Sequence, residues 1–229
     1  MTEAESDQIL RPEFWNVEAM KSSLLKGVNG NLYTESSFPK TILLNPQWIG
    51  FLEDLYYEMR EETTSRATFF YEHPEENARI LKTNAEHTKV LIQTKNQKGS
   101  NTHVSVDITK VKYPELLLGC LHKHPQEALF TSEDILPMTI SGGELIVGIV
   151  TPAKYYLAFR TKETPNLNPD VNFRRGYFLA MAKSHKVPIY RLRPSEIESF
   201  TMTPQILKEL RLPLFEGKRN QRRLELINS

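Results

Sequence analysis

Two histidines and an aspartate near the middle of the sequence have the types and spacing of metal ligands. His122 and His124 are two residues apart, and Asp134 follows after a short loop. Residues two apart in a strand project on the same side, so both imidazoles could bind one ion at the strand's end. Two neutral imidazoles and a carboxylate, with a fourth position left to water, are the ligand set of a catalytic zinc ion. The stretch therefore predicts a hydrolase that binds one Zn²⁺ per chain.

The residues around these three predict the elements that would position them. Leu116–Leu121 is an apolar run that is too short for an ordinary helix, which indicates a buried strand. Pro125 would end this strand because it lacks a backbone N–H. Thr131 is a suitable N-cap, and Asp134 lies three residues later, as in a capping box with Asp in place of Glu. Such a box would turn the Asp134 carboxylate back toward the end of the strand.

The same residues also have simpler interpretations. An isolated pair of histidines two residues apart occurs by chance on protein surfaces, and Asp134 could be no more than a favourable charge near a helix N-terminus. The surrounding pattern of apolar strand, proline, loop and helix start favours the metal site.

This pattern resembles the signature of the JAMM (MPN+, JAB domain) zinc metalloproteases. That signature is an apolar strand, a glycine, HxHP, a loop and SxxD, and here it corresponds to Gly119–Pro125 followed by Thr131 and Asp134. The resemblance implies that His122, His124 and Asp134 hold the zinc ion. Thr131 would take the place of the serine that helps to stabilise the tetrahedral intermediate. The chain departs from the family in this threonine and in a loop that is one residue shorter than usual.

The resemblance also implies an upstream glutamate that acts as general acid and base. Asn45 begins a predicted helix whose apolar stripe runs to Met59, and a strand rich in aromatic residues follows from Arg66. The family glutamate lies at this junction, where Glu62 fits and Glu61 is the alternative. Both could instead be ordinary charges at a helix end.

The order of apolar segments predicts an α/β fold with a mixed central sheet sandwiched by helices. Residues 144–150 and 155–160 read as consecutive strands, and helical segments lie outside them in the sequence. The resemblance implies the MPN/JAB-like architecture, which is also that of cytidine deaminases. We expect an N-terminal extension over residues 1–44, a catalytic core over 45–162, and a C-terminal helical extension with a basic tail over 163–229.

Composition excludes several classes of protein. The 229 residues carry a formal net charge of +1 and a single cysteine, Cys120. One cysteine cannot form an internal disulfide, an iron–sulfur cluster or the zinc site of deaminases, which needs a pair. We interpret Cys120 as a small side chain of the core. The sequence contains no apolar stretch long enough to span a membrane and no signal peptide, so we expect a cytoplasmic protein.

These observations together predict an enzyme that hydrolyses a peptide or isopeptide bond. The resemblance makes the substrate a protein, with removal or trimming of a ubiquitin-like modifier or a protein tail as the expected reaction. Glu62 and Thr131 would be the catalytic residues, and no other cofactor is expected. Membrane binding is not expected, and nucleic-acid binding would depend only on the basic cluster Gly217–Arg223. The alternative is a non-catalytic MPN-type scaffold that assembles a complex. The sequence does not decide whether the protein forms a homodimer or is a subunit of a larger complex.

Overall fold

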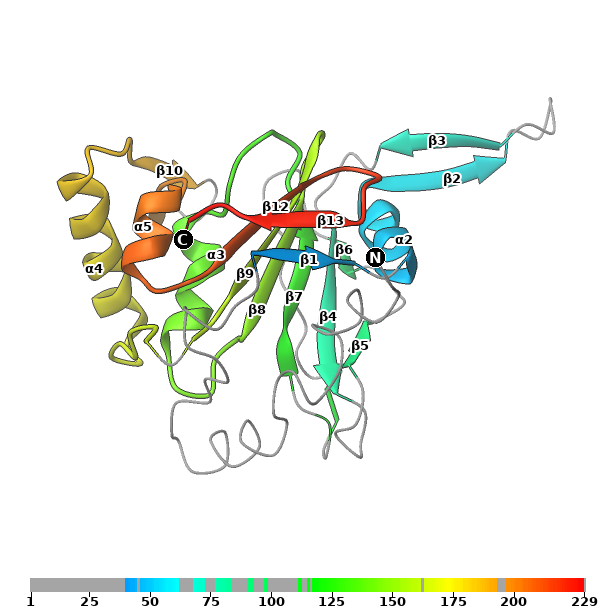
Figure 1. Ribbon diagram of the computed structural model, residues 1–229. Coiled ribbons are helices and arrows are strands. Elements are labelled where there is room, and N and C mark those ends of the chain that lie inside the picture. Colours follow the sequence, from blue (N-terminus) through cyan, green and yellow to red (C-terminus); the bar gives the residue numbers. More distant parts are fainter. Residues whose placement is uncertain are drawn as a thin grey trace.

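A mixed β-sheet forms the centre of the computed structural model, which describes residues 40–44, 46–61, 68–72, 77–83, 90–92, 97–98, 111–112, 115, 117–161, 163–192 and 197–228 (Figure 1). Within these residues the sheet has nine strands in the order β1-β13-β12-β9-β8-β7-β4-β5, and β6 also pairs with β4. The strands are β1 (Thr41–Leu43), β4 (Asn77–Thr83), β5 (Val90–Ile92), β6 (Gln97–Lys98), β7 (Leu117–Lys123), β8 (Ile146–Val150), β9 (Lys154–Phe159), β12 (Leu214–Lys218) and β13 (Arg223–Leu226).

Parallel and antiparallel pairs occur together in this sheet. β7 and β8 are parallel, and the other neighbouring strands are antiparallel. A parallel pair needs a crossover connection, which here contains α3 (Ser132–Ile135) and the 3₁₀ helix η5 (Leu136–Thr139). The predicted α/β class with a mixed central sheet is therefore confirmed.

Helices cover both faces of the sheet. α2 (Pro46–Tyr56) packs on one face through Leu52 and Leu55, which join a cluster with Leu121 of β7. The other face is covered by α3, η5, α4 (Val171–Ser184) and α5 (Pro204–Glu209), and Phe178 and Ile206 lie in its core. Because side chains alternate along β7, each face of this strand contacts a different helical layer.

A backbone irregularity at Gly119 decides which face receives the histidines. Leu118 and Leu121 both lie in the cluster on the α2 face although they are three residues apart, and Cys120 lies in the cluster on the opposite face. The register with β4 shifts at the same place, as in a β-bulge. Gly119 has φ +156°, and a Cβ there would lie 1.7 Å from the Ile146 carbonyl oxygen. A one-residue shift reverses the faces of all later residues, so the irregularity directs His122 toward α3.

Two further pairs of strands lie outside the main sheet. β2 (Tyr57–Glu61) pairs with β3 (Thr68–Glu72), and Figure 1 shows this hairpin extending away beyond α2. The helix predicted from Asn45 therefore ends earlier than expected: Met59 lies in β2, opposite Phe70 of β3. Aromatic residues and threonine in β3 favour the extended ladder over helix. β10 (Tyr190–Leu192) pairs with β11 (Ile197–Ser199).

The C-terminal region is not only helical. After α4 and α5, β12 joins the main sheet beside β9, and β13 lies beside β12. The basic cluster Gly217–Arg223 spans the turn between these two strands. The predicted basic tail is therefore part of the sheet, and the Arg219 side chain is buried and binds Glu53 of α2. The predicted N-terminal extension falls largely outside the described residues. No helix among the described segments is both long and apolar enough to cross a membrane.

Candidate metal centre

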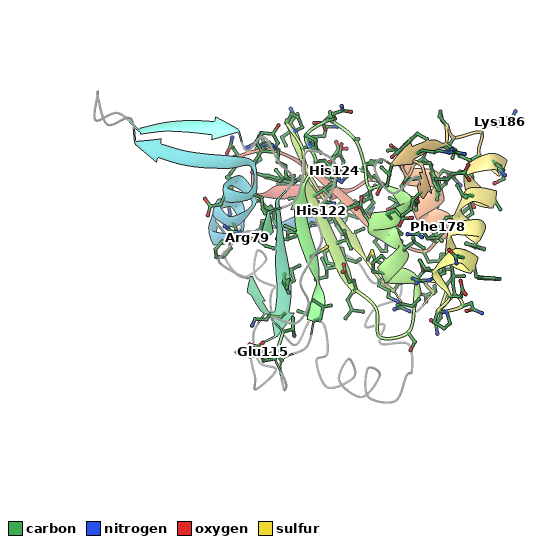
Figure 2. All side chains as sticks on the ribbon, turned by 180° about the vertical axis from the view of Figure 1, so that it is seen from behind. Arg79, Glu115, His122, His124, Phe178 and Lys186 are labelled. Carbon is green, nitrogen blue, oxygen red and sulfur yellow. The ribbon has the colours of Figure 1, made fainter. Side chains whose placement is uncertain are left out.

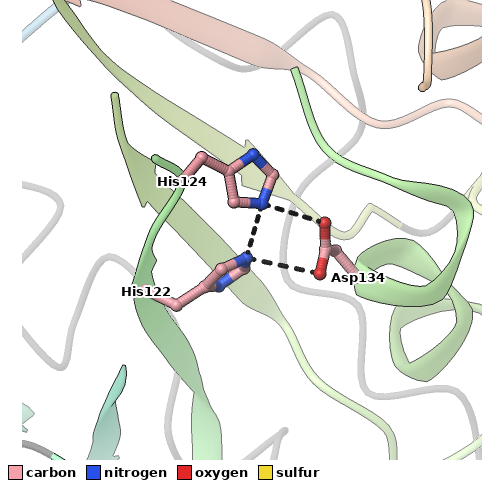
Figure 3. Close-up of side chains that lie close together, drawn as sticks. All are labelled: His122, His124 and Asp134. Carbon is pink, nitrogen blue, oxygen red and sulfur yellow. Dashed lines mark hydrogen bonds and ion pairs between the residues drawn. The ribbon is translucent and has the colours of Figure 1, made fainter. Parts of the chain in front are cut away.

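The two histidines lie where β7 ends, on the face of the sheet that α3 covers. His122 is in β7, and His124 follows the strand, with its backbone N–H donating to the Val150 carbonyl at 2.9 Å. Both side chains are buried. Their rings are tilted by 57° and their Nε2 atoms are 3.1 Å apart, so the rings meet at their nitrogen edges (Figure 3).

Asp134 approaches the histidines from the first turn of α3. Its carboxylate Oδ2 accepts hydrogen bonds from the Thr131 backbone N–H at 2.7 Å and from the Thr131 hydroxyl at 2.9 Å. The Thr131 hydroxyl in turn caps the Asp134 N–H at 3.4 Å, which completes a capping box. The structure thus confirms the predicted box, and the box turns the Asp134 carboxylate back toward the end of β7 (Figure 3).

The three side chains bring their ligand atoms together. Asp134 Oδ1 lies 3.3 Å from His122 Nε2, and Asp134 Oδ2 lies 3.4 Å from His124 Nε2. Ligands placed tetrahedrally at about 2.0–2.1 Å from a zinc ion are about 3.3 Å from one another. The two Nε2 atoms are 3.1 Å apart, and each lies at a similar distance from one of the two carboxylate oxygens. His122, His124 and Asp134 can therefore hold a metal ion.

The electrostatics of the cluster keep the carboxylate ionised. Burial alone would raise the pKa of Asp134, but the charge of His122 and hydrogen bonds from His122 and His124 outweigh it, and they hold the pKa well below its usual range. A carboxylate binds a metal in its deprotonated form. Asp134 is thus already in the protonation state of a ligand.

A half-buried carboxyl, Glu144, and a buried thiol, Cys120, lie on the same face as the histidines. Cys120 is two residues before His122, and its Sγ is 3.4 Å from Glu144 Oε2. Burial, with a further contribution from the Asp134 charge, raises the pKa of Glu144 to about 7, although the hydrogen bond from Cys120 opposes the increase. Burial also raises the pKa of the Cys120 thiol, as do the charges of Glu144 and Asp134. The thiol therefore stays protonated and donates to Glu144.

Sequence reasoning missed Glu144. It follows Gly142–Gly143 and begins an apolar segment, a position at which a charge is ordinarily exposed. The signal that could have found it is an acidic residue directly beside a core strand.

The structure tests the catalytic residues less fully. The Thr131 hydroxyl donates a hydrogen bond to Asp134, so in this arrangement it does not point to a substrate. Glu62 lies outside the described residues, and Glu61 is the last residue of β2. Their assignment as acid and base stays a prediction.

Comparisons of the chain with protein-family models, with curated proteins and with solved structures find no match. The fold and the cluster therefore define this protein only as a mixed α/β protein with a buried His–His–Asp site that can hold a metal ion.

Proposed function

We propose that this protein is a zinc-dependent hydrolase that cleaves a peptide or isopeptide bond. The observation that carries the proposal is the convergence of two imidazoles and one carboxylate at the end of β7. This donor set leaves coordination positions for water and substrate, as catalytic zinc sites do. Zinc is favoured over iron by the resemblance to the JAMM signature.

The cluster's own residues supply the geometry for this chemistry. When bound, a zinc ion polarises the scissile carbonyl and lowers the pKa of the attacking water toward about 7. The Thr131 N–H and hydroxyl hold the Asp134 carboxylate in place. To donate to the developing oxyanion, the Thr131 hydroxyl must turn away from Asp134. The Thr131 backbone N–H would still hold the Asp134 carboxylate. A donor to the oxyanion contributes on the order of a hundredfold to the rate.

The general acid and base is the least determined part of the proposal. By the resemblance, Glu62 takes the proton of the attacking water and returns it to the leaving amine. The strand beside the histidines offers a second choice: Ala78 of β4 pairs with His122, and the sequence just before Asn77 is Glu75–Glu76. Single Glu→Gln variants at 61, 62, 75 and 76 separate these candidates, since the catalytic one loses turnover but retains zinc.

The substrate class follows from the same resemblance. JAMM enzymes act on ubiquitin-like modifiers and protein tails, so we propose a protein substrate with an extended tail. An extended peptide can bind by adding a strand to a sheet edge, with main-chain hydrogen bonds for affinity.

Metal content measured by inductively coupled plasma mass spectrometry tests the proposal. We expect about one zinc per chain in wild type and none in His122→Ala. His185→Ala is the matched control, because His185 pairs with Glu209 at the end of α4 and not with the cluster. A wild type that holds iron in place of zinc, or that hydrolyses no amide in tests with modifier-tail substrates, would contradict the proposed activity.

A non-catalytic MPN-type scaffold is the second candidate. The engagement of the Thr131 hydroxyl with Asp134 and the shortened loop before it favour this function. It predicts no metal in wild type even after incubation with zinc, together with association of the protein into a dimer or a larger complex in light scattering.

A further inference from the structure

The helix that carries Asp134 is too short to hold its own position. α3 has four residues, and isolated helices of that length are not stable in water. Its orientation therefore depends on what contacts it from the rest of the chain. Those contacts come from residues much later in the sequence, in α4, at the end of β11 and just after β11.

One side of α3 is joined to the end of β11 and to the residues that follow it. The Ser132 hydroxyl hydrogen bonds to the Ser199 hydroxyl at 2.9 Å, and both residues are buried. The Ser132 N–H donates to the Phe200 carbonyl at 2.9 Å, and the Met202 N–H donates to the Phe130 carbonyl at 2.7 Å. These bonds fix the position of the first turn of α3 relative to residues 199–202.

The other side of α3 is held by two arginines of α4. Arg175 binds the Glu133 carboxylate with both arms of its guanidinium: Nε lies 3.0 Å from Oε1, and Nη2 lies 2.6 Å from Oε2. Arg174 is buried, and its Nη1 donates to the Leu136 carbonyl at 2.8 Å. A two-point contact with a planar guanidinium restricts orientation as well as distance.

Glu133 is the residue immediately before Asp134. Neighbouring residues on a helix point about 100° apart, so holding Glu133 against α4 fixes the rotation of α3 about its axis. That rotation decides whether the Asp134 carboxylate faces the histidines. The Thr131 capping box acts within the turn and cannot orient the turn as a whole.

We propose that Arg175 is a positioning residue of the metal centre, acting through Glu133. This inference rests on the proposed metal site. Residues that position a ligand from outside the coordination sphere typically change metal affinity by about 10–100-fold when they are replaced. The C-terminal region would thus be part of the functional site and not an appendage to it.

The experiment compares Arg175→Gln with a matched ion pair that does not touch α3. Lys82 and Glu115 form such a pair, with Nζ 2.7 Å from each carboxylate oxygen and similar exposure of both side chains. Glu115 lies at the far end of the sheet from the histidines (Figure 2). Lys82→Gln is therefore the control.

Two readouts are measured for each variant. The first is Zn²⁺ affinity by competition with a chelating dye. The second is the position of the His122 and His124 imidazole ¹H–¹⁵N signals in metal-free protein. We expect Arg175→Gln to weaken zinc binding about tenfold and to move both imidazole signals, with Lys82→Gln changing neither. Arg175→Lys keeps the charge but not the two-point contact, so it should recover only part of the affinity.

The outcomes separate this inference from the proposed function. If wild type binds no zinc, the proposed function fails, and the imidazole signals alone decide the positioning role. Signals that move in Arg175→Gln and not in Lys82→Gln support that role. Signals and zinc affinity that are the same in both variants would overturn it.

Discussion

The end of β7 has a largely buried ionic cluster on each side of the sheet, and the two clusters differ in which groups surround the carboxylate. The α2-face cluster consists of Glu53, Tyr56, Lys123, Tyr155 and Arg219. The α3-face cluster consists of His122, His124 and Asp134. In the first, Arg219 and the Tyr155 hydroxyl donate to one carboxylate, and Lys123 lies over the Tyr56 ring. In the second, the atoms that meet are all potential metal ligands.

In the α2-face cluster, the Glu53 carboxylate is fully engaged by hydrogen-bond donors of the same cluster. Arg219 binds Glu53 through Nε at 3.0 Å and through Nη2, and the Tyr155 hydroxyl donates to the same carboxylate. Burial and the bond to Glu53 raise the pKa of Tyr155, so the phenol stays protonated as a donor. Lys123 and Arg219 also lie over the Tyr56 ring, at 4.6 and 4.1 Å from its centre. The result is a crosslink between α2, the core strands and the β12–β13 turn.

The α3-face cluster brings together three side chains whose nitrogen and oxygen atoms can all bind a metal ion. Two imidazoles and a carboxylate with atoms 3.1–3.4 Å apart could be bridged by a metal cation at their centre. Both clusters are charged and largely shielded from solvent, and they differ in whether all the atoms that meet can bind one metal ion.

Gly119→Ala should have the largest effect, because it disturbs β7 and hence both clusters. The new Cβ would lie 1.7 Å from the Ile146 carbonyl oxygen at a φ of +156°. We expect the free energy of unfolding to fall by more than about 4 kcal/mol. Gly176→Ala is the matched control: a Cβ there meets nothing within 4 Å in α4, and helix propensity should stabilise it by up to about 1 kcal/mol. Urea unfolding of both variants makes the measurement, and equal stabilities would contradict the assigned role of Gly119.

Asp134→Asn separates the two clusters by metal binding. It replaces an ionised ligand by a neutral amide, so we expect zinc affinity to fall by more than about 100-fold. Glu53→Gln makes the same chemical change on the opposite face and should leave zinc binding as in wild type. Equilibrium dialysis of both variants against Zn²⁺ would show the contrast. A similar loss in both would mean that the clusters are not functionally distinct.

Local signals in the sequence are sufficient to predict much of the candidate metal site. The apolar run before His122, the proline after His124 and the Thr131–Asp134 spacing each act over a few residues, and the structure confirms the strand and the capping box. The mixed sheet followed from the order of strands and helices. These features depend on short-range rules that hold whatever the rest of the chain does.

Contacts between distant segments could not be predicted in this way. The pairs Arg175–Glu133 and Arg219–Glu53 join residues far apart in the chain, and their charges read as ordinary surface charges in sequence. The irregularity at Gly119 depends on how closely the Ile146 carbonyl approaches, which periodicity does not reveal. The early end of α2 is a further case, because pairing with β3 overrode the helical pattern near Met59.

We expect Glu53→Gln to lower the stability of the fold, whereas Asp134→Asn lowers metal binding. It leaves the buried Arg219 guanidinium without its counter-ion, so we expect a loss of about 3 kcal/mol in the free energy of unfolding. The double variant Glu53→Leu/Arg219→Met removes both charges and should recover most of this loss, as apolar replacements of buried ion pairs often do. Urea unfolding in the presence of chelator measures both. If the double variant is less stable than the single one, the cluster is not the self-balanced crosslink described here.

The smallest expected effect is a pH dependence from Glu144, the carboxyl beside the α3-face cluster. Its pKa is raised from 4.5 to about 7 by burial and by the Asp134 charge, so the folded protein binds this proton more tightly than the unfolded chain does. The resulting stabilisation is fully present below pH 4.5 and is lost as the pH rises through about 7. We expect metal-free wild type to lose about 1–2 kcal/mol between mildly acidic and mildly alkaline pH relative to Glu144→Gln, which cannot ionise. Urea unfolding at both pH values measures this difference. A difference between the two proteins that does not change with pH would show that Glu144 is already ionised in the folded state and that the cluster's surroundings are more polar than its burial indicates.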